Sequence, residues 1–269
     1  MQVLPAIDLS AYIKHYLFLN TKNKEVKKLR LFSDGNTGMV FSFKNQLIAQ
    51  FSGPNTPVYL PDSFIYGQLN SFKDLYCKGE TSLMIIVFHP HGLNHILSIP
   101  SKELNDTNIK TQDLFGSKGT ELQDKLFESG NIQDRISLAE DFFRKIIATK
   151  NPAAQPLITA SINYITQHKG LIPIKSLLEF TGLHERKLER NFMETIGISP
   201  KRFSNIIKLH VFLKQLRDRA DQTNLTCLGY EAGYYDQPHL IREFKKYTGL
   251  TPGQYSSLSN PLAINFLGF

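Results

Sequence analysis

The chain has 269 residues, a formal net charge of +7 and a pI near 9.2, and its length predicts two domains that each bury an apolar core without disulfide or metal support. Its two cysteines, Cys77 and Cys227, lie in different halves with no partner at metal-ligand spacing, which argues against a disulfide framework and a zinc knuckle and favours a reducing cytoplasm. The N-terminal segment has no basic leader ahead of an apolar run, and no stretch of about eighteen apolar residues occurs, so we expect neither secretion nor a membrane span.

The segment from Tyr12 to His89 has the composition of β-strands. It is rich in Val, Ile, Phe, Tyr and Thr, in short runs such as TGMVFSF, PVYL, SFIYGQL and TSLMIIVFH. Gly, Pro, Asn and Asp interrupt these runs at short intervals. The pattern predicts an antiparallel sandwich or half-barrel.

After Pro90 the apolar spacing becomes helical, first in GLNHILSI, then in GTELQDKLFE and IQDRISLAEDFFRKIIA. The last segment carries one broad apolar stripe, formed by Ile132, Ile136, Ala139, Phe142, Phe143 and Ile146. This helix either covers the sheet of its own domain or is presented to a second subunit. Residues 1–148 are thus predicted to be a β-rich sensing or dimerisation domain. The following segment TKNPAAQP, residues 149–156, has two prolines and no periodicity and is the expected linker.

Residues 157–257 are predicted to be an all-α domain of short helices. The helical pattern is interrupted at Gly170, Gly182, Gly197, Asp221, Gly233 and Gly249. One helix is longer: Ser199 is a good N-cap, Pro200 takes the first helical position, and apolar spacing continues to Arg219. This long helix can join two smaller units.

Those two units are copies of one another. When LERNFMETIGISPKRF at 188–203 is aligned with LIREFKKYTGLTPGQY at 240–255, six residues match at a constant offset of 52. The matches are Leu, Arg, Phe, Gly, Pro and a final aromatic residue, at 188/240, 190/242, 192/244, 197/249, 200/252 and 203/255. Gly182 matches Gly233 at an offset of 51, so the second copy has one extra residue in its turn. A fixed register over six positions indicates a duplicated structural unit.

Each copy reads as helix, glycine turn, helix. IKSLLEFTG ends at Gly182 before a helix containing HERKLERNFMETIG, and TCLGYEAG ends at Gly233 before DQPHLIREFKKYTG. This is the plan of a helix-turn-helix unit, whose second helix enters the major groove of DNA with its N-terminal residues at the base edges.

Helical spacing sorts the side chains of each second helix into two faces. The helix-turn-helix core is predicted to contain Leu188, Phe192, Leu240 and Phe244. The reading faces are predicted to contain Arg186, Glu189 and Arg190 in the first copy and Gln237, Pro238, Ile241 and Arg242 in the second. Arginine suits guanine, glutamine suits adenine, and glutamate accepts from cytosine or orients a neighbouring arginine. The alternative to base reading is that these side chains form an ordinary solvated helix face. The duplication in fixed register favours base reading.

The charge distribution agrees with a polyanionic partner for this region. Residues 156–255 hold 14 Lys and Arg against 9 Asp and Glu, which is most of the net positive charge of the chain. Charge alone does not show that the partner is nucleic acid, because many equally basic proteins never contact nucleic acid. Phosphate contacts are predicted for the basic side chains around the second helices, namely His184, Lys187, Lys201, Arg202, Lys245 and Lys246.

Residues 157–255 resemble the C-terminal domain of the AraC/XylS family of transcription regulators. The family's second-half signature is present almost whole as AGYYDQPHLIREFKKYTGLTPGQY, from Ala232 to Tyr255. The resemblance implies base reading by Arg186, Glu189 and Arg190 and by Gln237, Pro238, His239, Ile241 and Arg242. Two positions depart from the family's preferred alanine: Leu178 is expected to overfill its site, and Gly229 to underfill its site and loosen the second unit.

The N-terminal half resembles the small β-rich domain that precedes the DNA-binding part in one subset of these regulators. The resemblance is carried by FHPHGLNHILSIPSKEL, from Phe88 to Leu104, and by DLFG, from Asp113 to Gly116. It implies a sensing or dimerising role and identifies no ligand.

Three other functions fit parts of the sequence less well. A metal-binding cupin-like enzyme or sensor fused to a DNA-binding module could use His89, His91 and His95, although no glutamate follows at a ligand-like interval. A DNA-repair methyltransferase needs an activated cysteine, and Cys77 has only Lys78 beside it, on the opposite strand face. Cys227 is expected to be a small buried residue of its helix. Architectural binding without sequence preference relies on phosphate contacts and wedges instead of reading residues.

The prediction as a whole is a two-domain α+β regulator that binds two successive major grooves of double-stranded DNA. The half-barrel or sandwich comes first and the two helix-turn-helix units, joined by a long helix, come second. We expect no catalysis, no cofactor and no metal. We expect a homodimer, RNA polymerase as a partner, and an unidentified small-molecule effector. The apolar tail 258–269 is expected either to cover the core of the DNA-binding domain or to dock on the N-terminal domain or a second subunit.

Overall fold

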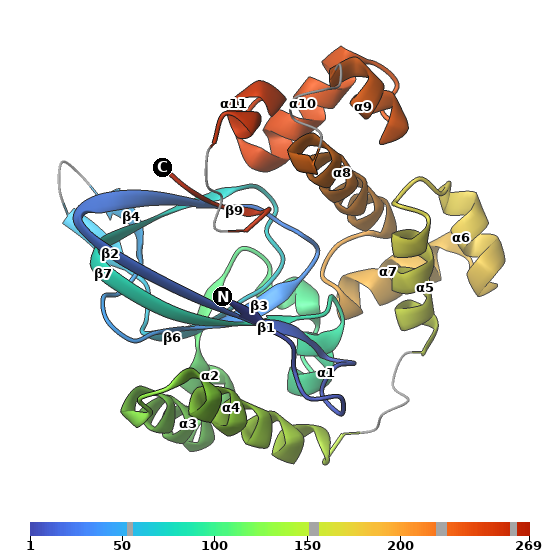
Figure 1. The fold of residues 1–269 in the computed structure, drawn as a ribbon. Coiled ribbons are helices and arrows are strands. Elements are labelled where there is room, and N and C mark those ends of the chain that lie inside the picture. The colour runs from blue at the N-terminus through green and yellow to red at the C-terminus, as the bar shows by residue number, and fades with distance from the viewer. Residues whose placement is uncertain (53–55, 151–155, 219–224, 259–262) are drawn as a thin grey trace.

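The computed structural model describes residues 1–52, 56–150, 156–218, 225–258 and 263–269. The chain forms a β-rich N-terminal part and a helical C-terminal part that lie against one another (Figure 1). None of the helices in these ranges is long and apolar enough to cross a bilayer.

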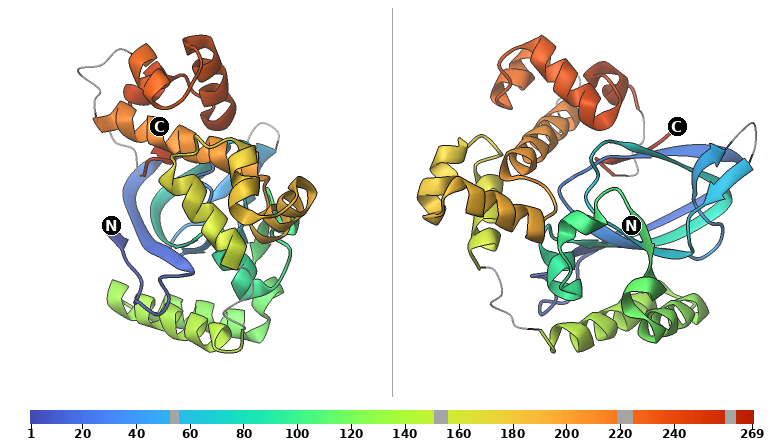
Figure 2. Two further views of the ribbon diagram at one scale, coloured as in Figure 1. Left: turned by 90° about the vertical axis from the view of Figure 1, so that its right-hand side faces the viewer. Right: turned by 180° about the vertical axis from the view of Figure 1, so that it is seen from behind.

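The described strands form one antiparallel sheet of nine strands, with the order β1-β2-β7-β3-β6-β8 and with β4, β5 and β9 attached to its sides. The strands are β1 Gln2–Val3, β2 Ile13–Leu31, β3 Thr37–Ser42, β4 Ile48–Ser52, β5 Thr56–Tyr59, β6 Ser63–Tyr66, β7 Lys73–Phe88, β8 Asn108–Lys110 and β9 Phe266–Gly268. The sheet is strongly curved (Figures 1 and 2), so the structure adopts the half-barrel and not the sandwich.

The expectation of short strands throughout is wrong for β2 and β7. β2 has 19 residues and β7 has 16, and they pair along most of their length, from Ile13 opposite Phe88 to Leu31 opposite Lys73. Gly79 lies within β7 with a φ of +78°, a conformation that glycine adopts without steric cost. A glycine with positive φ can bend a strand without ending it. In the sequence Gly79 resembles a turn signal, but in the structure it lies inside one continuous strand.

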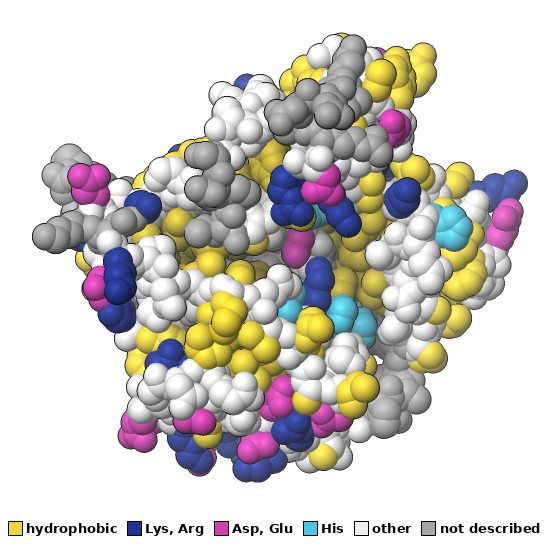
Figure 3. Space-filling model, in the orientation of Figure 1, with side chains coloured by type: hydrophobic (Ala, Val, Ile, Leu, Met, Phe, Trp, Pro, Cys, Tyr) yellow, Lys and Arg dark blue, Asp and Glu magenta, His cyan; other side chains and the backbone are white. Residues whose placement is uncertain are grey.

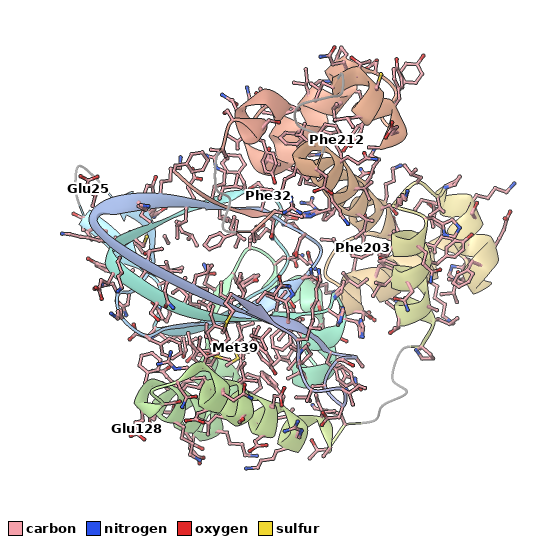
Figure 4. All side chains as sticks on the ribbon, viewed as in Figure 1. Glu25, Phe32, Met39, Glu128, Phe203 and Phe212 are labelled. Atoms are coloured by element: carbon pink, nitrogen blue, oxygen red, sulfur yellow. The ribbon has the colours of Figure 1, made fainter. Side chains whose placement is uncertain are left out.

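Helices cover one face of the sheet. They are α1 Gly92–Leu97, the 3₁₀ helix η1 Ser101–Leu104, α2 Thr111–Phe115, α3 Ser117–Glu128 and α4 Ile132–Ile147. α4 packs its apolar stripe, including Phe143, against sheet residues such as Met39 and Ile86, so the stripe covers the sheet of its own domain. Figure 4 labels Met39 in this layer between β3 and the helices.

The C-terminal part is helical as predicted. Its helices are α5 Pro156–Gln167, α6 Ile174–Thr181, α7 Glu185–Thr195, α8 Pro200–Asp218, α9 Leu225–Glu231, α10 Gln237–Thr248 and α11 Pro252–Ser256. Five of the glycines that interrupt the helical pattern have positive φ, namely Gly170, Gly182, Gly197, Gly233 and Gly249. Asp221 and most of the predicted linker lie outside the described residues.

α8 is the long joining helix, and it is buried on several sides. Ser199 accepts the backbone N–H of Arg202 at 3.2 Å, as expected for an N-cap. Phe203 and Phe212 of α8 are almost fully buried in one cluster with Phe32, which follows β2 in the N-terminal part. Figure 4 labels these three rings. The two parts therefore share a core across their contact.

The tail contacts both the N-terminal part and the core of the C-terminal helices. β9 pairs with β2, with Phe266 opposite Leu31 and Gly268 opposite Leu29. Leu267 is fully buried in the cluster of the C-terminal helices. The tail thus adds a strand to the N-terminal sheet and fills part of the helical core.

Candidate nucleic-acid interface

α6 with α7 and α9 with α10 form the two helix-turn-helix units. The chain turns at Gly182, with a φ of +65°, and at Gly233, with a φ of +80°. His184 caps α7, because its Nδ1 accepts the N–H of Lys187 at 3.2 Å, and Asp236 caps α10, because its carboxylate accepts the N–H of His239 at 2.7 Å. Each second helix therefore begins directly at its predicted reading residues.

Burial divides each second helix into the two faces expected from helical spacing. The inner face is fully buried, with 0% exposure for Leu188, Phe192, Leu240 and Phe244. The outer face is exposed at Arg186, Glu189, Arg190, Gln237, Pro238 and Arg242. In this structure the predicted reading faces of both units are therefore exposed to solvent.

Two candidate reading residues of the second unit are only half-exposed, namely His239 and Ile241. The ring of His239 contacts the edge of Tyr234, with centroids 5.7 Å apart. A half-buried side chain has a smaller choice of rotamers, so these two residues have less freedom to meet a base than Gln237 or Arg242.

The candidate phosphate contacts are exposed with one exception. The exposed ones are His184, Lys187, Lys201, Lys245 and Lys246. Arg202 instead donates from Nη2 to the carbonyl oxygens of Asn70 at 2.6 Å and Leu69 at 3.3 Å. Nη2 of Arg202 is therefore bound by the N-terminal part, against which α8 lies, so Arg202 is less available to a phosphate than the five exposed side chains.

α8 holds the second unit through a buried cation. The Nζ atom of Lys208 lies 3.6 Å from a carboxylate oxygen of Glu243 in α10 and 4.1 Å from the centroid of the Tyr234 ring. Burial lowers the pKa of the Lys208 ammonium, and the charge of Glu243 opposes this shift. The ring of Phe212 forms T-shaped pairs with the rings of Tyr234 and Phe244. These contacts hold α10 against α8.

The two departures from the preferred alanine are accommodated. A Cβ atom at Gly229 would lie 3.0 Å from Cδ2 of Leu240, so Leu240 already fills the space that was expected to be loose. Leu178 is half-buried at the edge of the helical cluster, where its extra volume extends toward solvent.

The expectation for Cys227 is wrong. This cysteine is exposed, whereas its neighbours Leu228 and Gly229 are buried. Successive residues of a helix point in directions about 100° apart. If the buried face is predicted one position away from its true place, a residue expected to be buried is exposed instead. Cys77 is 2% exposed, with Sγ 3.8 Å from the carbonyl oxygen of Lys27, so a bulky substrate cannot reach it.

The three histidines of the metal hypothesis are placed among aromatic rings. His95 stacks on Tyr12 with centroids 4.4 Å apart, and His89 stacks on His91 at 6.2 Å. Among the described residues, no group of three or more His, Cys, Asp and Glu side chains is arranged to hold a metal ion.

The half-barrel encloses a cavity of about 740 Å³. Apolar side chains of the sheet form one wall, and α8 and the tail close the other, with residues such as Val40, Phe64, Ile85, His210 and Phe266. Figure 3 shows Lys or Arg, Asp or Glu, and histidine side chains gathered around a hollow near the centre of the view. Burial lowers the pKa of His15, which lines the cavity, to about 4, so this histidine is neutral at pH 7.

Two family models match the chain. Residues 177–257 match a helix-turn-helix domain, and residues 1–110 match a domain of unknown function, DUF6597. An uncharacterized HTH-type transcriptional regulator from Haemophilus influenzae is 30% identical over 99 residues, which make up 37% of this chain and 33% of that protein. The chain thus spans about a third of the length of that relative.

Solved structures that match this chain include ToxT and XylR. ToxT from Vibrio cholerae aligns with a TM-score of 0.47 at 10% identity over 90% of this chain and 97% of that one. ToxT from Vibrio cholerae with a bound unsaturated fatty acid gives a TM-score of 0.46 at 10% identity over 90% and 94%. The xylose-binding transcription activator XylR aligns with a TM-score of 0.35 at 18% identity over 46% and 38%.

Proposed function

We propose, from the AraC-type helix-turn-helix domain that forms its C-terminal part, that this protein is a sequence-specific DNA-binding transcription regulator. The observation that carries the proposal is the pair of exposed reading faces, which occur at equivalent positions of two copies of one unit. A duplicated unit whose buried face is apolar and whose exposed face carries arginine and glutamine suits recognition of two successive major grooves.

In the proposed complex each second helix lies in a major groove. Arg190 and Arg242, which occupy equivalent positions, contact base edges, as do Arg186 and Gln237 near the helix starts. Glu189 accepts from cytosine or orients a neighbouring arginine. The remaining reading candidates, Pro238, His239 and Ile241, supply shape and apolar contact.

The exposed lysines are proposed to bind phosphates. We expect each of the single replacements Lys201→Ala, Lys245→Ala and Lys246→Ala to reduce the steepness of a plot of log affinity against log salt concentration by about one. The reason is that each lysine that binds a phosphate releases about one counterion from the DNA. Titrations at four salt concentrations measure the slope. Base preference should stay unchanged, and a lysine whose loss alters base preference would be a reading residue instead.

Selection from a random DNA pool with the full-length protein tests the function itself. We expect an enriched site with two recognised segments about ten base pairs apart, since two recognition helices in successive major grooves lie about 34 Å apart. Quantitative binding to the enriched site and to scrambled DNA at physiological salt gives the specificity ratio. Equal affinity for both would mean that the protein binds DNA without reading sequence or does not bind DNA as its function.

The N-terminal part is proposed to sense a small molecule in the half-barrel cavity. Its apolar wall suits a ligand with an apolar body, and Lys14, Asp34 and Lys73 supply charged groups that orient a polar end. The cavity contacts the sheet, α8 and the tail, so a ligand there touches both parts of the chain.

The protein acts by binding and not by catalysis, in the cytoplasm, as a homodimer that contacts RNA polymerase. Residues 1–148 form the sensing domain, 149–156 the linker, 157–257 the DNA-binding domain and 258–269 the tail. The metal-binding alternative is not favoured, because His91 and His95 pack against the ring of Tyr12.

A further inference from the structure

The N-terminal part contacts both recognition helices at the same position of the repeat. This position is the glycine that ends each helix, Gly197 after α7 and Gly249 after α10. A Cβ atom at Gly197 would lie 2.5 Å from Oδ1 of Asn105, and one at Gly249 would lie 2.6 Å from Nη1 of Arg30. Each glycine thus permits a close approach by the N-terminal part as well as the positive φ that ends the helix.

At the end of α7, three neutral side chains donate to backbone carbonyls. Ser101 Oγ donates to Thr195 O at 2.7 Å, and Asn105 Nδ2 donates to Gly197 O at 2.6 Å. Asn94 Nδ2 donates to Glu194 O at 3.1 Å. The last carbonyls of a helix have no partner within the helix, so these donors satisfy groups that otherwise need water.

At the end of α10, a cation takes the same place. Arg30 Nη1 donates to Gly249 O at 3.3 Å and to Thr248 O at 3.5 Å. A positive charge at a helix C-terminus is favoured by the helix dipole. α10 is therefore held at its C-terminal end, while its N-terminal reading residues stay exposed.

Arg30 is itself fixed in place from two sides. Its Nε and Nη2 atoms donate to the two carboxylate oxygens of Asp74 at 2.6 and 2.8 Å, and its guanidinium lies 4.2 Å from the centroid of the Phe72 ring. Burial acts to raise the pKa of Asp74, but the hydrogen bonds and charges of Arg30 and Lys28 outweigh it and hold the pKa below its usual value. Asp74 therefore stays ionised at neutral pH, and it also lines the half-barrel cavity.

We propose that the N-terminal part sets the separation of the two recognition helices by holding the C-terminal end of each. Ser101 and Asn105 are the positioning residues for α7, and Arg30 is the positioning residue for α10. Asp74, which holds Arg30 in place, also lies in the wall of the cavity. This inference rests on the proposed function and adds to it the residues that select operator spacing.

The test compares operators that differ only in spacing. Inserting one base pair between the two half-sites moves them apart by about 3.4 Å without altering either half-site. Wild-type full-length protein should lose affinity for each altered spacing. Arg30→Ala should reduce the ratio of affinities between the selected and altered spacings by about 5- to 30-fold, the factor that corresponds to a loss of about 1–2 kcal/mol. Base preference within each half-site should be unchanged.

Two further variants and a control make the result specific. Asn105→Ala removes a hydrogen bond at the other helix and should reduce the same ratio, so it decides the question if Arg30→Ala fails to fold. Arg30→Lys keeps the positive charge but loses the bidentate contact with Asp74. Its ratio of affinities should therefore lie between those of Arg30→Ala and the wild-type protein. Lys44→Ala removes an exposed ion pair with Glu80 on the same sheet and should leave the ratio unchanged.

The outcomes separate this inference from the proposed function. If Arg30→Ala and Asn105→Ala lower affinity equally at every spacing, both residues serve stability alone and the inference is wrong. If the wild-type protein shows no preferred base sequence, the proposed function is wrong instead. Retained base preference with a reduced spacing ratio supports both.

Discussion

Arg190→Ala and Arg242→Ala should each weaken binding to the selected operator by about 1–3 kcal/mol, because each variant removes a base contact. Both arginines are exposed, at equivalent positions of α7 and α10, and each lies two residues before a fully buried phenylalanine that anchors its helix. Truncation at the surface leaves that anchor intact, so the loss falls on binding and not on folding. Binding measured against operators with each base pair changed in turn gives the affected positions.

The two losses should map to separate positions about ten base pairs apart, since the helices enter successive grooves. Lys118→Ala, an exposed change in α3 of the N-terminal part, serves as the matched control and should leave affinity unchanged. If both arginine variants relax the same base pair, the two helices do not occupy separate grooves. In that case the duplicated unit serves another purpose.

The helical part could be predicted closely because its signals are local. Gly182, Gly233 and Gly249 end helices through positive φ, and a glycine at such a position is visible in the sequence itself. The buried and exposed faces of α7 and α10 follow from helical periodicity, which a single mismatched residue disturbs little. Cys227 shows where helical periodicity fails as a predictor. α9 has only seven residues, which are too few for the apolar spacing to define its buried face.

The contacts between the two parts could not be predicted, because they join residues far apart in sequence. Arg30 meets Gly249, and Arg202 meets Asn70, across more than a hundred residues. Nothing in the local sequence of Arg202 distinguishes an arginine that binds a phosphate from one that binds a backbone carbonyl. The same holds for β9, a strand of three residues whose pairing partner is β2.

Ending the chain at Leu258 should lower the free energy of unfolding of the full-length protein by about 3–6 kcal/mol. The estimate counts the lost burial of two side chains, Phe266 and Leu267, at about 1.5–3 kcal/mol each. Phe266 is buried against the sheet and Leu267 among the C-terminal helices, so the truncation weakens both cores. Urea unfolding of both proteins measures the difference.

Removal of Phe269 alone is the matched control, because this residue is 47% exposed and its loss should change stability little. The truncation also removes Ile264 and Phe266 from the wall of the half-barrel cavity and uncovers the edge of β2. We therefore expect the truncated protein to lose its response to any ligand of that cavity while keeping the base preference of its recognition helices. An unchanged free energy of unfolding would mean that the tail does not pair with β2 in solution, and the tail could then have no part in coupling the cavity to the DNA-binding units.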